Sequence, residues 1–237
     1  MKAQVMSWLR RVSAPILAAL GVGGLGVCLL TLFVFSWLAQ EVLEKEAFGF
    51  DTRILLFIHS SANPIFDALM LHLTTLADPE FVVAIVAIAI GILGWHRRWI
   101  ELRTFAIVCL GGFVLNTGLK LVFAKPRPHL WKPLIQETSY SFPSGHALGA
   151  VVVYGFLAFL LATRYPRSTR WIYASTIVLV SAIGLSRLYL GVHWPTDIIA
   201  GYSAGLLWLM IGITILRLQL RLDHSLAKRQ AESGKKF

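Results

Sequence analysis

The sequence predicts an all-α protein, an integral membrane bundle of six transmembrane helices with short interfacial helices between spans one and two. Hydrophobic residues make up 57% of the 237 residues and charged residues only 14%, whereas soluble domains carry roughly 25% charged residues. Several apolar runs approach the roughly 20 residues that a helix needs to cross a bilayer. The length leaves no room for a second sizeable domain, so we expect one domain over residues 1–237.

The first expected span is the uncharged run at residues 14–39. It is longer than the apolar core of a secretory signal peptide and lacks a clear cleavage site, so we expect the mature protein to retain it. Five further apolar runs are expected to span the membrane: 79–95, 104–123, 144–163, 171–185 and 195–216.

The apolar stretch at residues 54–77 is not expected to span the membrane. Asn63, Pro64 and Asp67 interrupt it, and neither half is long enough to cross the bilayer. We therefore predict two short helices that lie at the membrane surface, within an interfacial segment at residues 40–78.

The basic residues indicate the orientation of the bundle. If both termini are cytoplasmic, most of the 22 Lys and Arg residues fall in cytoplasmic segments, as the positive-inside rule requires. Residues 218–237 then form a basic cytoplasmic tail, and residues 40–78 lie on the extracytoplasmic side. Because this topology accounts for the net charge of +10, we expect no nucleic-acid partner.

Two minor patterns in the apolar runs point to packing rather than chemistry. Residues 21–26 match the dinucleotide-binding pattern G-x-G-x-x-G, but that site requires a preceding strand in a soluble domain. Inside a membrane span we expect small residues to allow close helix packing. Cys28 and Cys109 also lie in apolar runs, so we expect them to behave as small hydrophobic residues.

Three cations lie at the expected outer ends of two spans. They are Lys120, Arg127 and Arg187. Ionisable groups near membrane depth are costly, so they usually face a cavity or carry function. Phosphate is the anion that best suits them, because arginine offers a planar fork of donors and lysine a point charge. The alternative is that each side chain extends toward lipid headgroups.

Two helix starts add histidines to these cations. Ser144 and Gly145 precede His146 at the start of one span, where an N-cap residue and free backbone N–H groups favour an anion. His193 precedes another span, with Asp197 four residues later. A carboxylate on one imidazole nitrogen leaves the other nitrogen free to attack. Read separately, the first pattern is also an ordinary cap and the second also a surface histidine beside a buried aspartate.

These residues resemble a known signature. The stretches KLVFAKPRP (120–128), PSGH (143–146) and SRLYLGVHWPTD (186–197) match, in order and spacing, three motifs of the type 2 phosphatidic acid phosphatase superfamily: K-x6-RP, PSGH and SR-x5-H-x3-D. The motif core covers residues 120–197, and no motif residue departs from the pattern. The short spacing between the first two motifs resembles small bacterial membrane enzymes that act on phosphatidylglycerophosphate, phosphatidate and undecaprenyl diphosphate.

The resemblance implies a role for each motif residue. His193 is expected to attack phosphorus and form a phosphohistidine, Asp197 to orient His193, and His146 to protonate the leaving group. Phosphate-binding roles fall on Lys120, Arg127, Ser144, Gly145 and Arg187.

We therefore expect hydrolysis of a lipid phosphate or diphosphate at the outer face of a membrane, most simply the bacterial inner membrane. We expect no metal or other cofactor, because no dense Asp/Glu cluster is present to hold Mg²⁺. Fixed cations and a helix N-terminus are expected to stabilise the phosphoryl oxygens in place of a metal ion. The sequence leaves open a lipid-to-lipid phosphotransferase, a lipid-binding or transport protein, and a vanadate-dependent haloperoxidase, as well as the preferred lipid and the oligomeric state.

Overall fold

The computed structural model describes residues 2–44 and 49–233, and every regular element in these ranges is helical, as predicted. Residues 45–48 of the expected interfacial segment and residues 234–237 of the expected tail lie outside the described residues. The elements are α1 (Lys2–Leu43), α2 (Gly49–His59), α3 (Pro64–Thr75), α4 (Pro79–Trp95), α5 (Trp99–Phe123), α6 (Gly145–Arg164), the 3-10 turn η1 (Pro166–Ser168), α7 (Thr169–Tyr189) and α8 (Pro195–Ser233).

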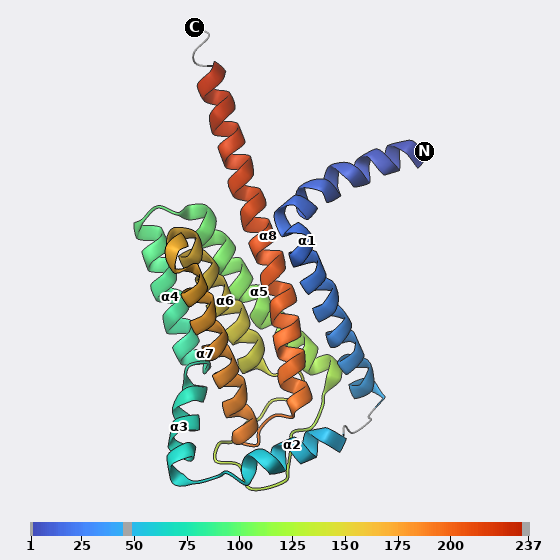
Figure 1. The fold of residues 1–237 in the computed structure, drawn as a ribbon, viewed down its shortest axis with the longest axis vertical. Helices are drawn as coiled ribbons and strands as arrows, with labels where there is room; N and C mark the ends of the chain where they lie inside the picture. Colours follow the sequence, from blue (N-terminus) through green and yellow to red (C-terminus); the bar gives the residue numbers. More distant parts are fainter. Residues whose placement is uncertain (1, 45–48, 234–237) are drawn as a thin grey trace.

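Within the described residues, five helical segments are long and apolar enough to cross a membrane. A sixth candidate is the pair of α3 and α4, which are bent by 45° at the break between them. This number agrees with the six predicted spans. Two short helices cover the stretch 54–77, as predicted: α2, which begins earlier, at Gly49, and α3 (Figure 1). The sixth span is reached only when α3 is included, whereas the prediction placed α3 at the membrane surface and let 79–95 cross alone.

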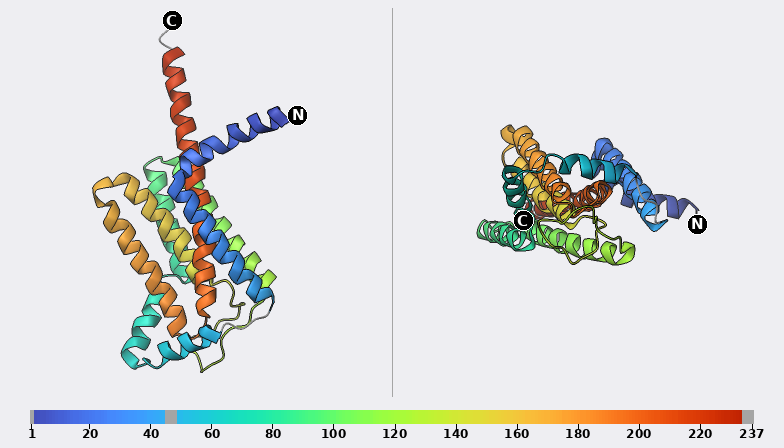
Figure 2. Two further views of the ribbon diagram at one scale, coloured as in Figure 1. Left: turned by 45° about the vertical axis from the view of Figure 1, so that its right-hand side comes forward. Right: turned by 90° about the horizontal axis from the view of Figure 1, so that it is seen from below.

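The two ends of the bundle differ in character. The helices α2 and α3 and the long loop between α5 and α6 gather at one end, whereas α1 and α8 extend beyond the other end (Figures 1 and 2). Helix α8 does not stop near residue 216 but continues through most of the basic tail to Ser233. Helix α7 extends to Tyr189, so Arg187 lies in its last turn.

The glycine pattern near the N-terminus has a different role from the predicted one. Gly21 adopts φ 71° inside α1, a conformation that glycine tolerates best, and the chain turns sharply there (Figure 1). The spanning segment therefore begins at Gly23 rather than at residue 14. Side chains built on Gly21, Gly23 or Gly26 would meet no atom within 4 Å, so the predicted close helix packing at these glycines is wrong.

Close packing of α6 against α8 positions the site. A Cβ on Gly201 would lie 2.7 Å from the carbonyl oxygen of Ser144, and one on Gly205 would lie 2.9 Å from that of Leu148. These glycines let the first turns of the two helices approach each other. The backbone N–H of Ser144 donates to the carbonyl of Asp197 at 3.1 Å, so the second and third motifs are joined directly.

Candidate active site

One cavity of about 570 Å³ collects residues from all three motifs. They come from the end of α5, the loop after it, the first turn of α6 and the loop before α8. The predicted site residues that line this cavity are Lys120, Arg127, Gly145, His146 and His193. Ser144, Arg187 and Asp197 are fully or almost fully buried and do not line the cavity.

Two arginines from different motifs share one carboxylate. Arg187 donates to Oε1 of Glu137, and Nη2 of Arg127 lies 3.5 Å from Oε2 of the same residue. Arg187 also donates to Oγ1 of Thr74 at 2.7 Å. Burial acts to raise the pKa of Glu137, but the two arginines overcome it and hold the pKa below its usual value. A carboxylate thus lies where the motif cations are expected to hold an oxyanion.

Lys120 and Arg127 also bind the loop between α5 and α6. Nζ of Lys120 donates to Oγ of Ser139 at 3.1 Å and to the carbonyl of Tyr140. Arg127 donates to the carbonyls of Ser139 at 2.7 Å and Val192 at 2.6 Å. These bonds fix both cations at the cavity wall without neutralising their charge.

His193 is buried and lies between an acid and a cation. Its Nδ1 lies 3.4 Å from Oδ2 of Asp197, and its Nε2 lies 3.4 Å from Nη1 of Arg127. Burial lowers the pKa of His193 to about 3, against the opposing effect of Asp197 and with a further contribution from the nearby arginines. The imidazole is therefore neutral near pH 7 and retains a lone pair for attack.

Asp197 is fixed by several donors besides the histidine. Nζ of Lys125 lies 2.9 Å from Oδ1, the backbone N–H of Trp194 donates to Oδ2 at 2.8 Å, and Ser141 donates to Oδ2 as well. Lys125 lies within the first motif stretch, but at a position that the motif leaves unspecified, so no sequence pattern selects it.

Helix α2 is joined to the start of α8. The carboxylate of Asp51 accepts from the backbone N–H of Thr196 at 3.1 Å and from its hydroxyl at 2.7 Å. The same hydroxyl accepts from Nζ of Lys125 at 2.9 Å. Asp51 is 4% exposed, and burial raises its pKa. Asp51 lies in the segment expected to be interfacial, and no sequence pattern predicted its contact with the third motif.

His146 pairs with a carboxylate that no sequence pattern predicted. Its Nε2 lies 2.8 Å from Oδ1 of Asp78, the residue that precedes α4. Ser144 is the N-cap residue of α6, as expected, and its Oγ accepts from the backbone N–H of Ala147. No local pattern links Asp78 to a motif that begins more than sixty residues later, so only the tertiary fold reveals this pair.

The cavity continues from this polar end into an apolar groove. Between Lys120 and Cys109, which both line the cavity, α5 rises by about 16 Å. The apolar lining residues on α4 and α5 include Val83, Val86, Ile90, Leu110 and Phe113. Among the described residues no group of three or more His, Cys, Asp or Glu could hold a metal ion. The arrangement suits an oxyanion held against a neutral imidazole, with an apolar chain attached to it.

Comparison with known proteins places these motifs in a family. The family model described as PAP2 superfamily matches residues 101–221. Phosphatidylglycerophosphatase B of Bacillus subtilis is 34% identical over 61% of this chain and 72% of its own length. Undecaprenyl-diphosphatase of Sulfolobus acidocaldarius is 27% identical over 76% of this chain and 84% of its own length.

A solved structure has the same fold. The crystal structure of a transmembrane PAP2-type phosphatidylglycerolphosphate phosphatase from Bacillus subtilis superposes with a TM-score of 0.68 at 27% identity. The match covers 79% of this chain and 92% of that one. The crystal structure of LpxE from Aquifex aeolicus, at 23% identity and a TM-score of 0.58, shares the fold over 70% of this chain.

Proposed function

Because the chain belongs to the PAP2 superfamily and is a lipid phosphatase embedded in the membrane, we propose that it hydrolyses phosphatidylglycerophosphate, phosphatidate or undecaprenyl diphosphate without a metal ion. The main support is that one cavity joins the motif residues to an apolar groove along α4 and α5. The terminal phosphoryl group binds at the polar end, and the lipid chain lies in the groove.

In this proposal the phosphoryl group takes the place of the Glu137 carboxylate. Arg127 and Arg187 already hold an oxyanion there, and bidentate arginine contacts suit phosphate oxygens equally well. Lys120, Ser144 and the backbone N–H of Gly145 at the start of α6 complete the set, because a helix N-terminus favours an anion. These donors stabilise the charge that spreads over the equatorial oxygens during phosphoryl transfer.

The first step transfers the phosphoryl group to the enzyme. Nε2 of His193 attacks phosphorus while the bond from phosphorus to the leaving oxygen breaks. Asp197 accepts from Nδ1 and stabilises the positive charge on the phosphorylated imidazole. His146 donates a proton to the leaving oxygen, which departs as the lipid alcohol or the lipid monophosphate.

The second step releases phosphate. His146, now neutral, accepts a proton from a water molecule that attacks phosphorus, and the bond to Nε2 of His193 breaks. Inorganic phosphate leaves, and both histidines return to their starting protonation states. No metal is used, since the cations and the helix N-terminus supply the electrostatic stabilisation.

We also propose that the chain is a single domain of the bacterial inner membrane, with the motif core at 120–197. Its termini, including the basic tail at 218–237, lie in the cytoplasm, and the cavity faces the other side. The positive-inside rule supports this orientation, as does the extension of α1 and α8 from the same end of the bundle. The lipid reaches the cavity sideways from the bilayer, through the groove beside α4.

The test is phosphate release by the purified protein in detergent, in excess EDTA and without an added acceptor. We expect kcat/KM to be measurable for at least one of the three lipids, and a phosphohistidine to be trapped on His193. His193→Ala should abolish turnover, whereas His129→Ala, which alters an exposed loop histidine outside the cavity lining, should not. Turnover by His193→Ala contradicts the nucleophile assignment. Phosphate transfer only in the presence of a lipid acceptor indicates a phosphotransferase instead.

A further inference from the structure

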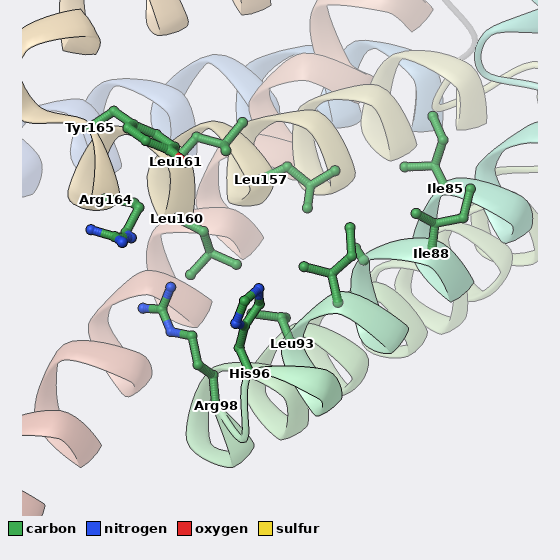
Figure 3. A pocket seen from close by; sticks show the side chains of 12 residues that line it. Ile85, Ile88, Leu93, His96, Arg98, Leu157, Leu160, Leu161, Arg164 and Tyr165 are labelled. Atoms are coloured by element: carbon green, nitrogen blue, oxygen red, sulfur yellow. The ribbon is translucent and has the colours of Figure 1, made fainter.

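A second cavity, of about 610 Å³, lies between α4 and α6 at the end of the bundle away from the motifs (Figure 3). Its apolar wall is formed mainly by isoleucines of α4 and leucines of α6. Its other end is lined by three basic side chains, which are labelled in Figure 3. These are His96, Arg98 and Arg164.

This second cavity is separate from the candidate active site. No residue lines both cavities, although α4 contributes to both through different side chains. Arg164 is the last residue of α6 and His146 lies in its first turn, in a helix of 20 residues. A helix of that length spans about 30 Å, so the two polar ends lie near opposite faces of the membrane.

The packing of α4 leaves this groove open. Helix α4 packs mainly against α5 and covers little of α6. Ile88 is 63% exposed, Ile92 is 55% exposed and Leu161 is 48% exposed. In a membrane-spanning segment such exposed apolar side chains contact lipid chains, so an acyl chain is the natural occupant of the apolar wall.

The basic residues at one end of the second cavity indicate that its ligand is negatively charged. Two bonds, at 3.0 and 2.7 Å, join Arg98 to one carboxylate oxygen of Glu101. The guanidinium of Arg164 lies over the ring of Tyr165, 5.8 Å from its centroid. Glu101 balances the charge of Arg98, and Arg164 leaves the net charge at this end of the cavity positive. Basic pockets between transmembrane helices suit anionic headgroups.

We propose that this groove is a second lipid site, which binds one anionic phospholipid. One acyl chain lies between α4 and α6, and the phosphate lies between Arg98 and Arg164. The bound lipid fills the gap that α4 leaves beside α6. It thereby supports the helix that also lines the catalytic groove and that begins beside Asp78. This site does not depend on the chemistry proposed for the active site.

Native mass spectrometry of the purified full chain tests the proposal with phosphatidylglycerol and phosphatidylcholine of identical chains. Phosphatidylglycerol has no terminal phosphoryl group to hydrolyse. We expect the wild type to bind one phosphatidylglycerol more tightly than phosphatidylcholine. Combined Arg98→Gln and Arg164→Gln should weaken phosphatidylglycerol binding by about tenfold or more, because charged hydrogen bonds to phosphate are lost.

Combined Arg167→Gln and Arg170→Gln is the matched control. It removes the same two charges from the same end of the bundle, and Arg170, like Arg164, lies over an aromatic ring, that of Trp171, but neither residue lines the groove. We expect this variant to bind as the wild type does. Equal affinity for the two lipids, wild-type affinity in the double variant, or an equal loss in the control each overturns the proposal.

A second variant tests the acyl chain independently of charge. Ala89 lines the groove, so Ala89→Phe should fill the chain site and weaken phosphatidylglycerol binding. Size-exclusion chromatography and circular dichroism establish that the variant is folded. A folded Ala89→Phe protein with undiminished affinity shows that the chain lies elsewhere and also overturns the proposal.

Discussion

The contact between Asp78 and His146 provides a direct test of the acid assigned to the active site. Nε2 of His146 lies 2.8 Å from Oδ1 of Asp78. Asp78→Asn preserves the shape of that side chain but removes its charge, so protonated His146 loses its counter-ion. We expect proton transfer to the leaving oxygen to slow, with little change in phosphate binding.

The magnitude follows from the burial of the pair. A hydrogen bond to a charged group contributes about 1.5–3 kcal/mol, and an exposed ion pair about 0–1 kcal/mol. The side chain of His146 is 13% exposed and that of Asp78 is 37% exposed, so this contact falls between the two cases. Since about 1.4 kcal/mol corresponds to a factor of ten in rate, we expect kcat for phosphatidate to fall about tenfold.

Two substrates with different leaving groups separate the acid role from a structural one. Phosphatidate releases an alkoxide that needs a proton, whereas p-nitrophenyl phosphate releases a phenolate that is stable without one. Asp78→Asn should therefore slow phosphatidate hydrolysis and leave p-nitrophenyl phosphate hydrolysis close to the wild-type rate. Glu80→Gln, a charge-removing change at an exposed position two residues away, is the control. An equal loss on both substrates, or no loss on either, refutes the reasoning.

Three further predictions concern the same cavity. Lys125→Met should lower kcat/KM for phosphatidate by about tenfold or more, because the buried carboxylate of Asp197 loses its closest cation; Lys125→Arg should restore part of the loss. Glu137→Gln should lower the inhibition constant of orthovanadate, because the two arginines no longer bind an internal carboxylate. The thermal unfolding midpoint should fall as the pH drops from about 6.5 toward about 3. In that range His193, with a folded pKa of about 3, binds a proton only in the unfolded chain, so the decline should be shallower in His193→Gln.

The sequence predicted the spans and the motif residues for physical reasons. Bilayer thickness sets the length of an apolar run, so five of the six expected spans appear as helices long enough to cross, and α4 as part of a bent pair. The motif histidines lie at helix starts, which proline and serine mark in the sequence. Once two helix starts and the end of α5 meet at one end of the bundle, their side chains reach one cavity.

The partners of those residues could not be predicted in the same way. Asp51, Asp78 and Glu137 are single carboxylates in three separate segments, and no periodic pattern distinguishes them from other acids. Their roles arise from contacts across the fold: with Thr196, with His146 and with the two arginines. Gly21, Gly23 and Gly26 show the opposite case. Small residues permit close packing, but no other described helix packs against these three positions.

The carboxylates in this site also bear on which lipids it selects. Asp51 and Asp197 accept from backbone N–H groups of the helix start, so they are fixed in place. Among the described residues, Glu137 binds the side chains of Arg127 and Arg187 and no backbone N–H, so we expect it to be the acid that a substrate displaces. A terminal phosphoryl group brings up to two charges and three free oxygens, and it competes well against one carboxylate. A phosphodiester brings one charge and two free oxygens, no more than Glu137 itself. If the substrate displaces Glu137 as proposed, we expect the internal carboxylate to favour lipids with a terminal phosphate over the phosphodiesters that make up the surrounding bilayer.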